Sequence, residues 1–506
     1  MIDTGSKAAL AGSPDGIQQL KALVDSALGA LHDAALKRGG PVAPGGPQAA
    51  KAAVHEALGG GMFLTDDPSA QRVTDLFQAY ATWAADLTHP SAVARMQCAP
   101  TAAAAAAELV AGVLNQSLHA WESGPFALEL ERQLIAEMAS WVGYSTQASG
   151  TLTPGGSISN LMGLLLARDY ALSEVSREGL AGRPIRPRIL CSAAAHFSVA
   201  RAAAFLGLGR DAVLKVPVDE RGRMLTGEAR RILAGLAPDE IPMALVATAG
   251  TTDHGSFDPL PELATLAAEY RLWLHVDAAY GIGALFSPKL ATLLDGLAEA
   301  DSIAFDLHKF GWTPASSSVL LVRDRRHMNC LDEQAVYLNP SDDEAAGFTS
   351  LLGTSLQTTR RSDALKIAAT LLTVGRAGMG DWVDACYEQA QHAAARIAAS
   401  DALALVAEPI LSTVIFHCRS TDAAPVEDED AWNSAIRRKL MTDGTALLAR
   451  TKITGPDGIA RVHLKLVFLN PTTTNEEIDK LLTDIAAVAG ELAVSGPQRV
   501  GEEASL

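Results

Sequence analysis

Between Ser149 and Asp324, short apolar segments alternate with segments that have the apolar spacing of helices. The expected strands are Arg188–Cys191, Val213–Val216, Met243–Thr248, Trp273–Val276, Ser302–Phe305 and Ser318–Val322. The expected helices are Asn160–Ala171, Ser198–Leu206, Thr226–Leu236 and Leu260–Tyr270. Strand–helix units of this length predict an α/β fold with a mostly parallel central sheet and helices on both faces. Sheets of this kind bind their ligands beyond the carboxyl ends of the strands.

The segments on either side of this alternating region predict other kinds of structure. Apolar residues recur at helical spacing over residues 17–37, 73–87, 102–118 and 129–142, with a Pro/Gly linker at 39–47. Later, Ser362 begins a long helix, and strand-like runs at 411–417 and 462–468 are mixed with helices. We therefore expect a helical N-terminal arm (1–110), a large α/β domain (111–375), a small C-terminal α+β domain (376–492) and a flexible tail (493–506).

Charge and cysteine usage exclude several classes of function. The formal net charge is −17 and no basic stripe is present, so neither nucleic acid nor a membrane is expected as a partner. The five cysteines are scattered without a CxxC pair, which is typical of a reducing compartment. No signal peptide is evident, and the most apolar stretch, 101–114, is too short to span a bilayer. We therefore expect a soluble, cytoplasmic protein. We expect no metal site, because His254, His275 and His308 have no companion ligands.

One lysine stands between the last two expected strands. Lys309 follows His308 and precedes Gly311 and Pro314, a combination that predicts a tight loop flanked by buried strands. Partial burial would disfavour the ammonium form and leave an amine that can attack a carbonyl carbon. The alternative is a surface-loop lysine beside a chance histidine, and this stretch alone favours neither interpretation.

A glycine-rich loop opens the first helix of the alternating region, in the sequence Thr-Pro-Gly-Gly-Ser-Ile-Ser-Asn over residues 153–160. Gly155 and Gly156 let the backbone approach an anion closely, and Ser157 adds a hydroxyl donor beside the positive end of the helix. The alternative is an ordinary helix start that a serine caps.

Three further residues lie where expected strands end. His196 can stack on a flat ligand or be a hydrogen-bonded structural residue. Thr248 can point into the crevice or belong to an ordinary glycine turn. Asp277 ends a buried strand and is followed by the small Ala278 and Ala279; a carboxylate there needs a cation or a donor. A protonated pyridine nitrogen would meet that need, whereas the alternative is a cap on a neighbouring helix.

Together, an anion site, a stacking histidine, a strand-end aspartate and a loop lysine meet the requirements of pyridoxal 5′-phosphate (PLP). The stretches Gly155–Leu161, Ala195–Ser198, His275–Tyr280 and Asp306–Lys309 resemble those of the group II PLP-dependent amino-acid decarboxylases. The resemblance extends over residues 87–470. Segments 355–366 and 115–125 resemble most the bacterial diaminobutyrate and lysine decarboxylase branch of that family.

The resemblance implies a PLP fold-type I (aspartate-aminotransferase-like) homodimer whose active sites lie at the subunit interface, with the N-terminal arm wrapped around the partner. It implies that Lys309 forms the Schiff base with PLP, that Asp277 pairs with the pyridinium nitrogen, and that His196 stacks on the ring. These three residues are the expected catalytic residues. Further contacts to PLP are implied for Gly155, Gly156, Ser157, Thr248, Ala279, Asp306 and His308.

The loop at 339–356 departs from the family pattern. The resemblance implies a proton-donating tyrosine in this loop, but Phe348 is its only aromatic residue and Leu351 falls near the tyrosine's place. Tyr337, His196 or a residue of the partner subunit could supply the proton instead. Loss of the tyrosine in relatives favours oxidative deamination, so two products are open: an amine, or an aldehyde.

The expected substrate is a small L-amino acid. The acidic Asp342, Asp343 and Glu344 on the same loop, with Glu122 after Trp121, would suit a cationic side chain such as that of diaminobutyrate, ornithine or lysine. If these charges are only solvated, an aromatic or acidic amino acid is the alternative substrate. A non-catalytic binding protein on the same fold is a further hypothesis.

Overall fold

The computed structural model describes residues 9–59, 69–332, 337–420, 425–455 and 457–495. The chain forms two compact units, Gln97–Tyr387 and Met1–Met96 with Glu388–Leu506. Most of the tail predicted at 493–506 lies outside the described residues. None of the described helices combines the length and the apolar character that a membrane crossing requires.

A seven-stranded sheet forms the centre of the unit Gln97–Tyr387, with the strand order β2-β8-β7-β6-β5-β3-β4. The strands are β2 (Ser149–Thr153), β3 (Arg186–Ser192), β4 (Val213–Val216), β5 (Glu240–Thr248), β6 (Trp273–Asp277), β7 (Ser302–Asp306) and β8 (Ser318–Val322). The strands from β7 to β4 run parallel, and β8 is antiparallel to both of its neighbours. The predicted α/β fold with a mostly parallel sheet is confirmed, and so are all the expected strands.

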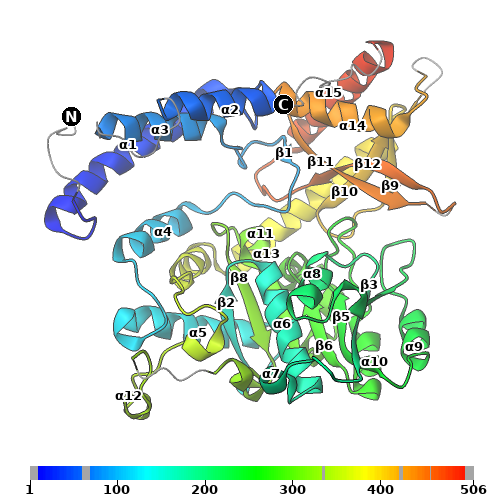
Figure 1. Ribbon diagram of the computed structural model, residues 1–506. Coiled ribbons are helices and arrows are strands. Elements are labelled where there is room, and N and C mark those ends of the chain that lie inside the picture. The colour runs from blue at the N-terminus through cyan, green and yellow to red at the C-terminus, as the bar shows by residue number, and fades with distance from the viewer. Residues whose placement is uncertain (1–8, 60–68, 333–336, 421–424, 456, 496–506) are drawn as a thin grey trace. The chain divides into compact units, whose positions relative to one another are not determined.

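Helices cover this sheet on both faces (Figure 1). The expected helices correspond to α6 (Gly156–Ala171), α8 (Ser198–Phe205), α9 (Thr226–Ala234) and α10 (Leu260–Tyr270). Apolar side chains of α6 and α8 pack against alternate residues of the strands, and α10 packs on β5 and β6. Every residue of β6, β7 and β8 is buried, which requires cover on both sides of these strands.

The remaining α-helices among the described residues of this unit are α4 (Ala102–Leu114), α5 (Pro125–Trp141), α7 (Val175–Glu178), α11 (Leu307–Phe310), α12 (Ser341–Ala345) and the first part of α13 (Ala364–Ala398). The helix expected over 102–118 ends at Leu114, earlier than predicted. Asn115 adopts a left-handed conformation (φ 48°) that ends the helix, as asparagine often does. In α13, Gly375 has φ 69° and ψ 168°, so this long segment is two helices joined at a kink.

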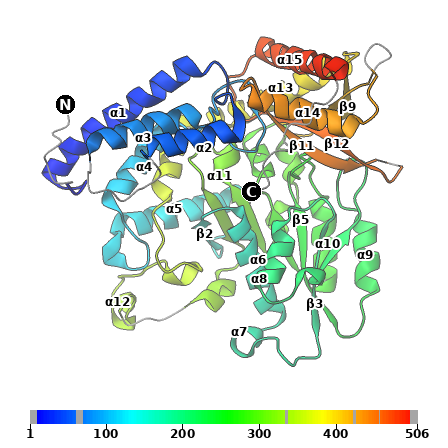
Figure 2. The ribbon, with the colours of Figure 1, turned by 45° about the horizontal axis from the view of Figure 1, so that its top comes forward.

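The other unit contains a five-stranded sheet of order β1-β11-β12-β10-β9. Its strands are β1 (Ala92–Val93), β9 (Leu403–Ala407), β10 (Thr413–Cys418), β11 (Leu447–Thr454) and β12 (Ala460–Val467). Its described α-helices are α1 (Pro14–Arg38), α2 (Gly46–Ala57), α3 (Ala70–Trp83), the second part of α13, α14 (Glu429–Thr442) and α15 (Asn475–Ser495). Helices α1 and α3 lie side by side in both ribbon views (Figures 1 and 2). The sheet packs against α14 and α15 around Trp432, Phe416 and Phe468.

Candidate active site

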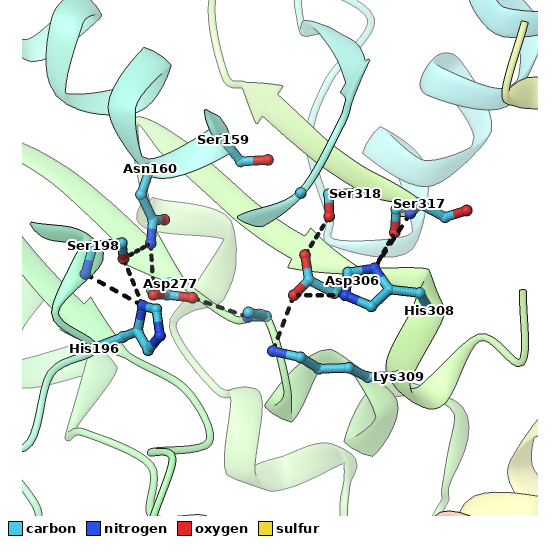
Figure 3. A network of polar contacts seen from close by, with 12 residues as sticks. Ser159, Asn160, His196, Ser198, Asp277, Asp306, His308, Lys309, Ser317 and Ser318 are labelled. Carbon is cyan, nitrogen blue, oxygen red and sulfur yellow. Dashed lines mark hydrogen bonds and ion pairs between the residues drawn. The ribbon is translucent and has the colours of Figure 1, made fainter. Parts of the chain in front are cut away.

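Lys309 stands on α11, a single helical turn between β7 and β8 (Figure 3). Its Nζ lies 2.9 Å from Oδ2 of Asp306, the last residue of β7. The lysine side chain is 18% exposed and the aspartate side chain only 4%. The interpretation of Lys309 as a surface-loop lysine is therefore wrong. The aspartate partner was not foreseen, because the loop was not expected to be helical and only a helical turn brings these two side chains together.

Asp306 is held on several sides. The hydroxyl of Ser318 on β8 donates a hydrogen bond to Oδ1 of Asp306. Gly156 packs directly on the carboxylate, since a Cβ at this glycine would lie 2.9 Å from Oδ1. His308 Nε2 is 3.7 Å from Oδ2 of Asp306. The Asp306 carboxylate thus contacts the glycine loop, β8 and Lys309 at the carboxyl end of β7.

The glycine loop leaves the start of α6 open. Gly155 has φ 130°, a conformation that requires glycine, and α6 begins at Gly156 without a side-chain cap. Ser159 instead shares a hydrogen bond with the hydroxyl of Thr153, with 2.6 Å between the two oxygens. The serine-cap interpretation is therefore wrong. The backbone N–H groups of Ile158 and Ser159 donate to the carbonyl oxygen of Gly155. Those of Gly156 and Ser157 have no partner among the described residues and remain available for an anion such as a phosphate.

Asp277 ends β6, is buried, and accepts two hydrogen bonds. The side-chain amide of Asn160 donates to Oδ2 at 2.8 Å, and the backbone N–H of Ala279 donates to Oδ1 at 3.1 Å. Neither donor belongs to the first turn of a helix that Asp277 would cap, so the helix-cap interpretation is wrong. These donors stabilise an anionic carboxylate at the strand end.

A chain of buried hydrogen bonds leads from the core to Asp277. Trp273 Nε1 donates to Ser302 Oγ at 2.8 Å, and Ser302 is 2.8 Å from His275 Nδ1. His275 Nε2 is 2.9 Å from the Asn160 carbonyl oxygen, so the amide nitrogen of Asn160 faces Asp277. Burial lowers the pKa of His275 to about 4, which keeps this ring neutral near pH 7.

His196 lies after β3 and is half-buried. The backbone N–H of Ser198 donates to its Nδ1 at 3.3 Å, and the Ser198 hydroxyl is 2.8 Å from the same nitrogen. Since Nδ1 accepts hydrogen bonds, a neutral His196 carries its proton on Nε2. Burial lowers the pKa of His196, which favours this neutral form.

Thr248 ends β5 next to this network and has a buried hydroxyl that finds no hydrogen-bond partner among the described residues. Its backbone N–H donates to Asp258 at 2.7 Å, so the strand end itself is well anchored. A buried hydroxyl without a partner is costly in a finished core and is typical of a site that a ligand completes.

These residues fit PLP. The open N–H groups of α6 suit a phosphate, the Asp277 carboxylate suits a protonated ring nitrogen, Lys309 offers an amine, and Thr248 offers an unused hydroxyl. The sequence did not reveal Asn160, Ser302 or Ser318 as contributors. Strand alternation could have indicated His275, because residues two apart on a strand share a face and His275 precedes Asp277 by two.

The two residues Leu351 and Tyr337, which were considered in connection with the missing tyrosine, have different surroundings. Leu351 is 8% exposed and packs in an apolar cluster with Leu118, Leu128 and the partly buried Trp121. Tyr337, by contrast, is 83% exposed. The place expected for a proton-donating tyrosine is thus held by an aliphatic side chain that is buried against the start of α5.

The chain is similar to proteins of known activity. Residues 66–419 match the family model of the pyridoxal-dependent decarboxylase conserved domain. The L-2,4-diaminobutyrate decarboxylase of Rhizobium meliloti (strain 1021) is 40% identical over 405 residues, which are 80% of this chain and 79% of the relative. The enzyme of the same name from Acinetobacter baumannii is 32% identical over 434 residues, 83% of each chain.

One solved structure also resembles the chain closely. It is the glutamate decarboxylase domain of diaminobutyrate-pyruvate transaminase and L-2,4-diaminobutyrate decarboxylase from Vibrio parahaemolyticus. It is 30% identical, has a TM-score of 0.83, and the match covers 95% of this chain and 97% of that one. This likeness confirms fold-type I, and the family excludes a merely non-catalytic binding protein. The chain belongs to the pyridoxal-dependent decarboxylase family and is a PLP-dependent amino-acid decarboxylase.

Proposed function

We propose that the enzyme decarboxylates a small diamino acid, with 2,4-diaminobutyrate favoured over ornithine and lysine, to the corresponding amine and CO₂. The observation that carries this proposal is the identity of 40% and 32% to two L-2,4-diaminobutyrate decarboxylases over four fifths of the chain. Glu122 and the acidic residues of α12 are largely exposed and so add a negative surface that attracts cationic amino acids.

The proposal assigns PLP to the site around Lys309. Lys309 would bind the cofactor covalently, Asp277 would pair with its ring nitrogen, and His196 and Ala279 would lie on either face of its ring. The phosphate would be held by Gly155, Gly156, Ser157 and His308, and Thr248 would use its free hydroxyl on cofactor or substrate. When bound there, PLP supplies the electron sink for the electron pair that remains when CO₂ leaves.

The chain's own residues would do three things for the reaction. Asp277, fixed by Asn160 and Ala279, presents a negative charge that keeps a facing ring nitrogen protonated. The buried strand ends exclude water from that ion pair and so strengthen it. His196 holds its proton on Nε2, because its Nδ1 accepts from the backbone N–H of Ser198, and this N–H would be available as a hydrogen-bond donor to cofactor or substrate.

A substrate screen tests this proposal directly. We would measure CO₂ release from the twenty standard amino acids, 2,4-diaminobutyrate and ornithine, with the Lys309→Ala variant as the inactive control. The highest kcat/KM is expected for 2,4-diaminobutyrate. A clear preference for an aromatic or acidic amino acid would contradict the diamino-acid substrate without contradicting decarboxylation.

A second outcome of the reaction is supported by the loop at 339–356, which contains no tyrosine. Slow protonation would give oxygen time to react, with an aldehyde, ammonia and peroxide as products. Assaying amine, aldehyde and peroxide in air and under nitrogen separates the two outcomes. Leu351→Tyr should raise the share of amine if the new tyrosine ring leaves the apolar cluster for the site. If the wild-type enzyme already forms only amine in air, another residue donates the proton.

We also propose a cytoplasmic homodimer. Support comes from exposed apolar side chains on two helices: Leu28, Leu31 and Leu36 on α1, and Val110 and Leu114 on α4. Such side chains are typical of surfaces that a partner covers. Light scattering of the purified enzyme should give twice the mass of one chain, and a monomer at micromolar concentration would contradict this part of the proposal.

A further inference from the structure

Lys309 and Asp306 form an ion pair whose carboxylate cannot easily move. Oδ1 of Asp306 accepts from Ser318, and Gly156 leaves no space beside the carboxylate, so Oδ2 stays directed at the lysine, 2.9 Å from Nζ. Both partners are mostly shielded from water, with 4% and 18% of their side chains exposed. Figure 3 shows the lysine amine reaching back to this carboxylate.

The other groups around the lysine are engaged elsewhere. Asp277 accepts from Asn160 and from the backbone of Ala279. His196 Nδ1 already accepts hydrogen bonds from Ser198, so its remaining lone pair is used. Asp306 is therefore the acceptor placed to receive a proton from the ammonium.

The contact between Nζ and Oδ2 offers a direct path for one proton. Moving one proton from the Lys309 ammonium to the Asp306 carboxylate turns two charged groups into two neutral ones. The transfer leaves a free electron pair on Nζ, which an ammonium lacks and which attack on a carbonyl carbon requires.

We propose that Asp306 is the base that takes the proton from the Lys309 ammonium and so frees the amine that binds the cofactor. One proton moves from Nζ to Oδ2, and no electrons are gained or lost. The free amine of Lys309 would then be able to condense with the carbonyl group of PLP, with one water released. Asp306 returns the proton when a substrate amine displaces the lysine. The proposal rests on the proposed role of Lys309 and gives Asp306 a part in the reaction beyond contact with PLP.

The test measures how fast PLP becomes attached, independently of turnover. The full-length enzyme is freed of PLP, mixed with it, and quenched at intervals with borohydride, and mass spectrometry quantifies the reduced adduct on Lys309. For Asp306→Asn we expect attachment about 100-fold slower than wild type near neutral pH. The difference should shrink as pH rises, because hydroxide can then remove the proton.

Two controls separate this role from a structural one. Asp301→Asn removes a carboxylate beside the other end of β7, where it accepts from the backbone N–H of Leu274, and should leave the attachment rate unchanged. The non-covalent affinity for PLP can be measured by fluorescence in Lys309→Ala and in the double variant Lys309→Ala/Asp306→Asn. The two dissociation constants should agree within about twofold. Formate should restore part of the rate in Asp306→Ala, because it can occupy the vacated carboxylate position.

The outcomes are distinguishable. If Asp306→Asn attaches PLP as fast as wild type, or faster, the carboxylate only holds the ammonium in place and the proposal is overturned. If wild type itself forms no adduct on Lys309, the proposed cofactor site fails instead.

Discussion

Asp277 at the end of β6 accepts a hydrogen bond of 2.8 Å from the side chain of Asn160 in the first turns of α6. The link ties the strand that carries the carboxylate to the helix that follows the glycine loop. The ring nitrogen of a bound cofactor would contact β6 and its phosphate would contact α6, and this hydrogen bond connects the two elements.

Replacing Asp277 by asparagine should preserve the fold and the attachment of PLP to Lys309. It removes the negative charge that would keep the ring nitrogen protonated, so kcat should fall at least about 100-fold. Kinetics per mole of attached PLP would check this, with circular dichroism to establish folding. Near-normal turnover would mean that the end of β6 does not face the ring nitrogen.

Asn160→Ala should lower kcat by about tenfold while leaving Asp277 in place, because the carboxylate loses one donor and its fixed orientation. A suitable control is Asn433→Ala, which removes an equally buried asparagine from the other unit. Both variants should lose thermal stability, but only Asn160→Ala should slow turnover of the fully loaded enzyme. Equal kinetic losses would point to general destabilisation.

Stability should fall in mild acid because of His275. Burial lowers its pKa from the ordinary 6.5 to about 4. Between these values the unfolded chain binds a proton that the folded chain does not. The free energy of unfolding is therefore unaffected by His275 above pH 6.5 and decreases as the pH falls towards 4. The loss amounts to about 3 kcal/mol.

Urea unfolding at about pH 7.5 and about pH 4.5 would check this, with His275→Asn as the variant that cannot take up a proton. The variant should be less stable than wild type at the higher pH, and most of that difference should vanish at the lower pH. Parallel pH dependences in the two proteins would show that His275 is not the group responsible.

The buried pair of Arg360 and Glu131 offers a stability prediction. Arg360 Nη1 lies 2.7 Å from Glu131 Oε2, and the two side chains are only 5% and 2% exposed. Arg360→Met should destabilise the enzyme by about 3–5 kcal/mol, because it leaves the Glu131 carboxylate buried without a cation. Adding Glu131→Gln should recover a large part of that loss. Purely additive losses in a double-mutant cycle from chemical denaturation would contradict this coupling.

The strands of the central sheet could be predicted because most are continuous apolar runs that need burial on both faces. The exception is β2, whose sequence Ser-Gly-Thr-Leu-Thr contains a single large apolar residue. Its strand conformation comes from pairing with β8, a partner about 170 residues later in the chain, which local pattern cannot reveal. Gly150 is required there, since a Cβ would collide with the carbonyl oxygen of Leu320.

The candidate site was predictable to the extent that single residues at strand ends carry its chemistry. What the sequence could not show were contacts that depend on tertiary approach, such as Asn160 reaching Asp277 from another element. The pairing of Asp306 with Lys309 needed a helical turn at α11, whose four residues are too few for any periodicity to be visible. The burial of Leu351 likewise depends on packing against distant residues.

The hydrogen bond between Ser318 and Asp306 joins residues that are direct partners in the antiparallel pair of β7 and β8. The lysine's counter-ion is therefore positioned by sheet register and not by the length of the connection between the two strands. Insertions between Gly311 and Ser316 would leave the carboxylate untouched as long as that register is kept. A slip of β8 by one residue would bring Ser317 or Val319 opposite Asp306 and turn the other face of the strand towards the site. Natural or engineered variation in length should accordingly be found in the connection and be absent from the strand.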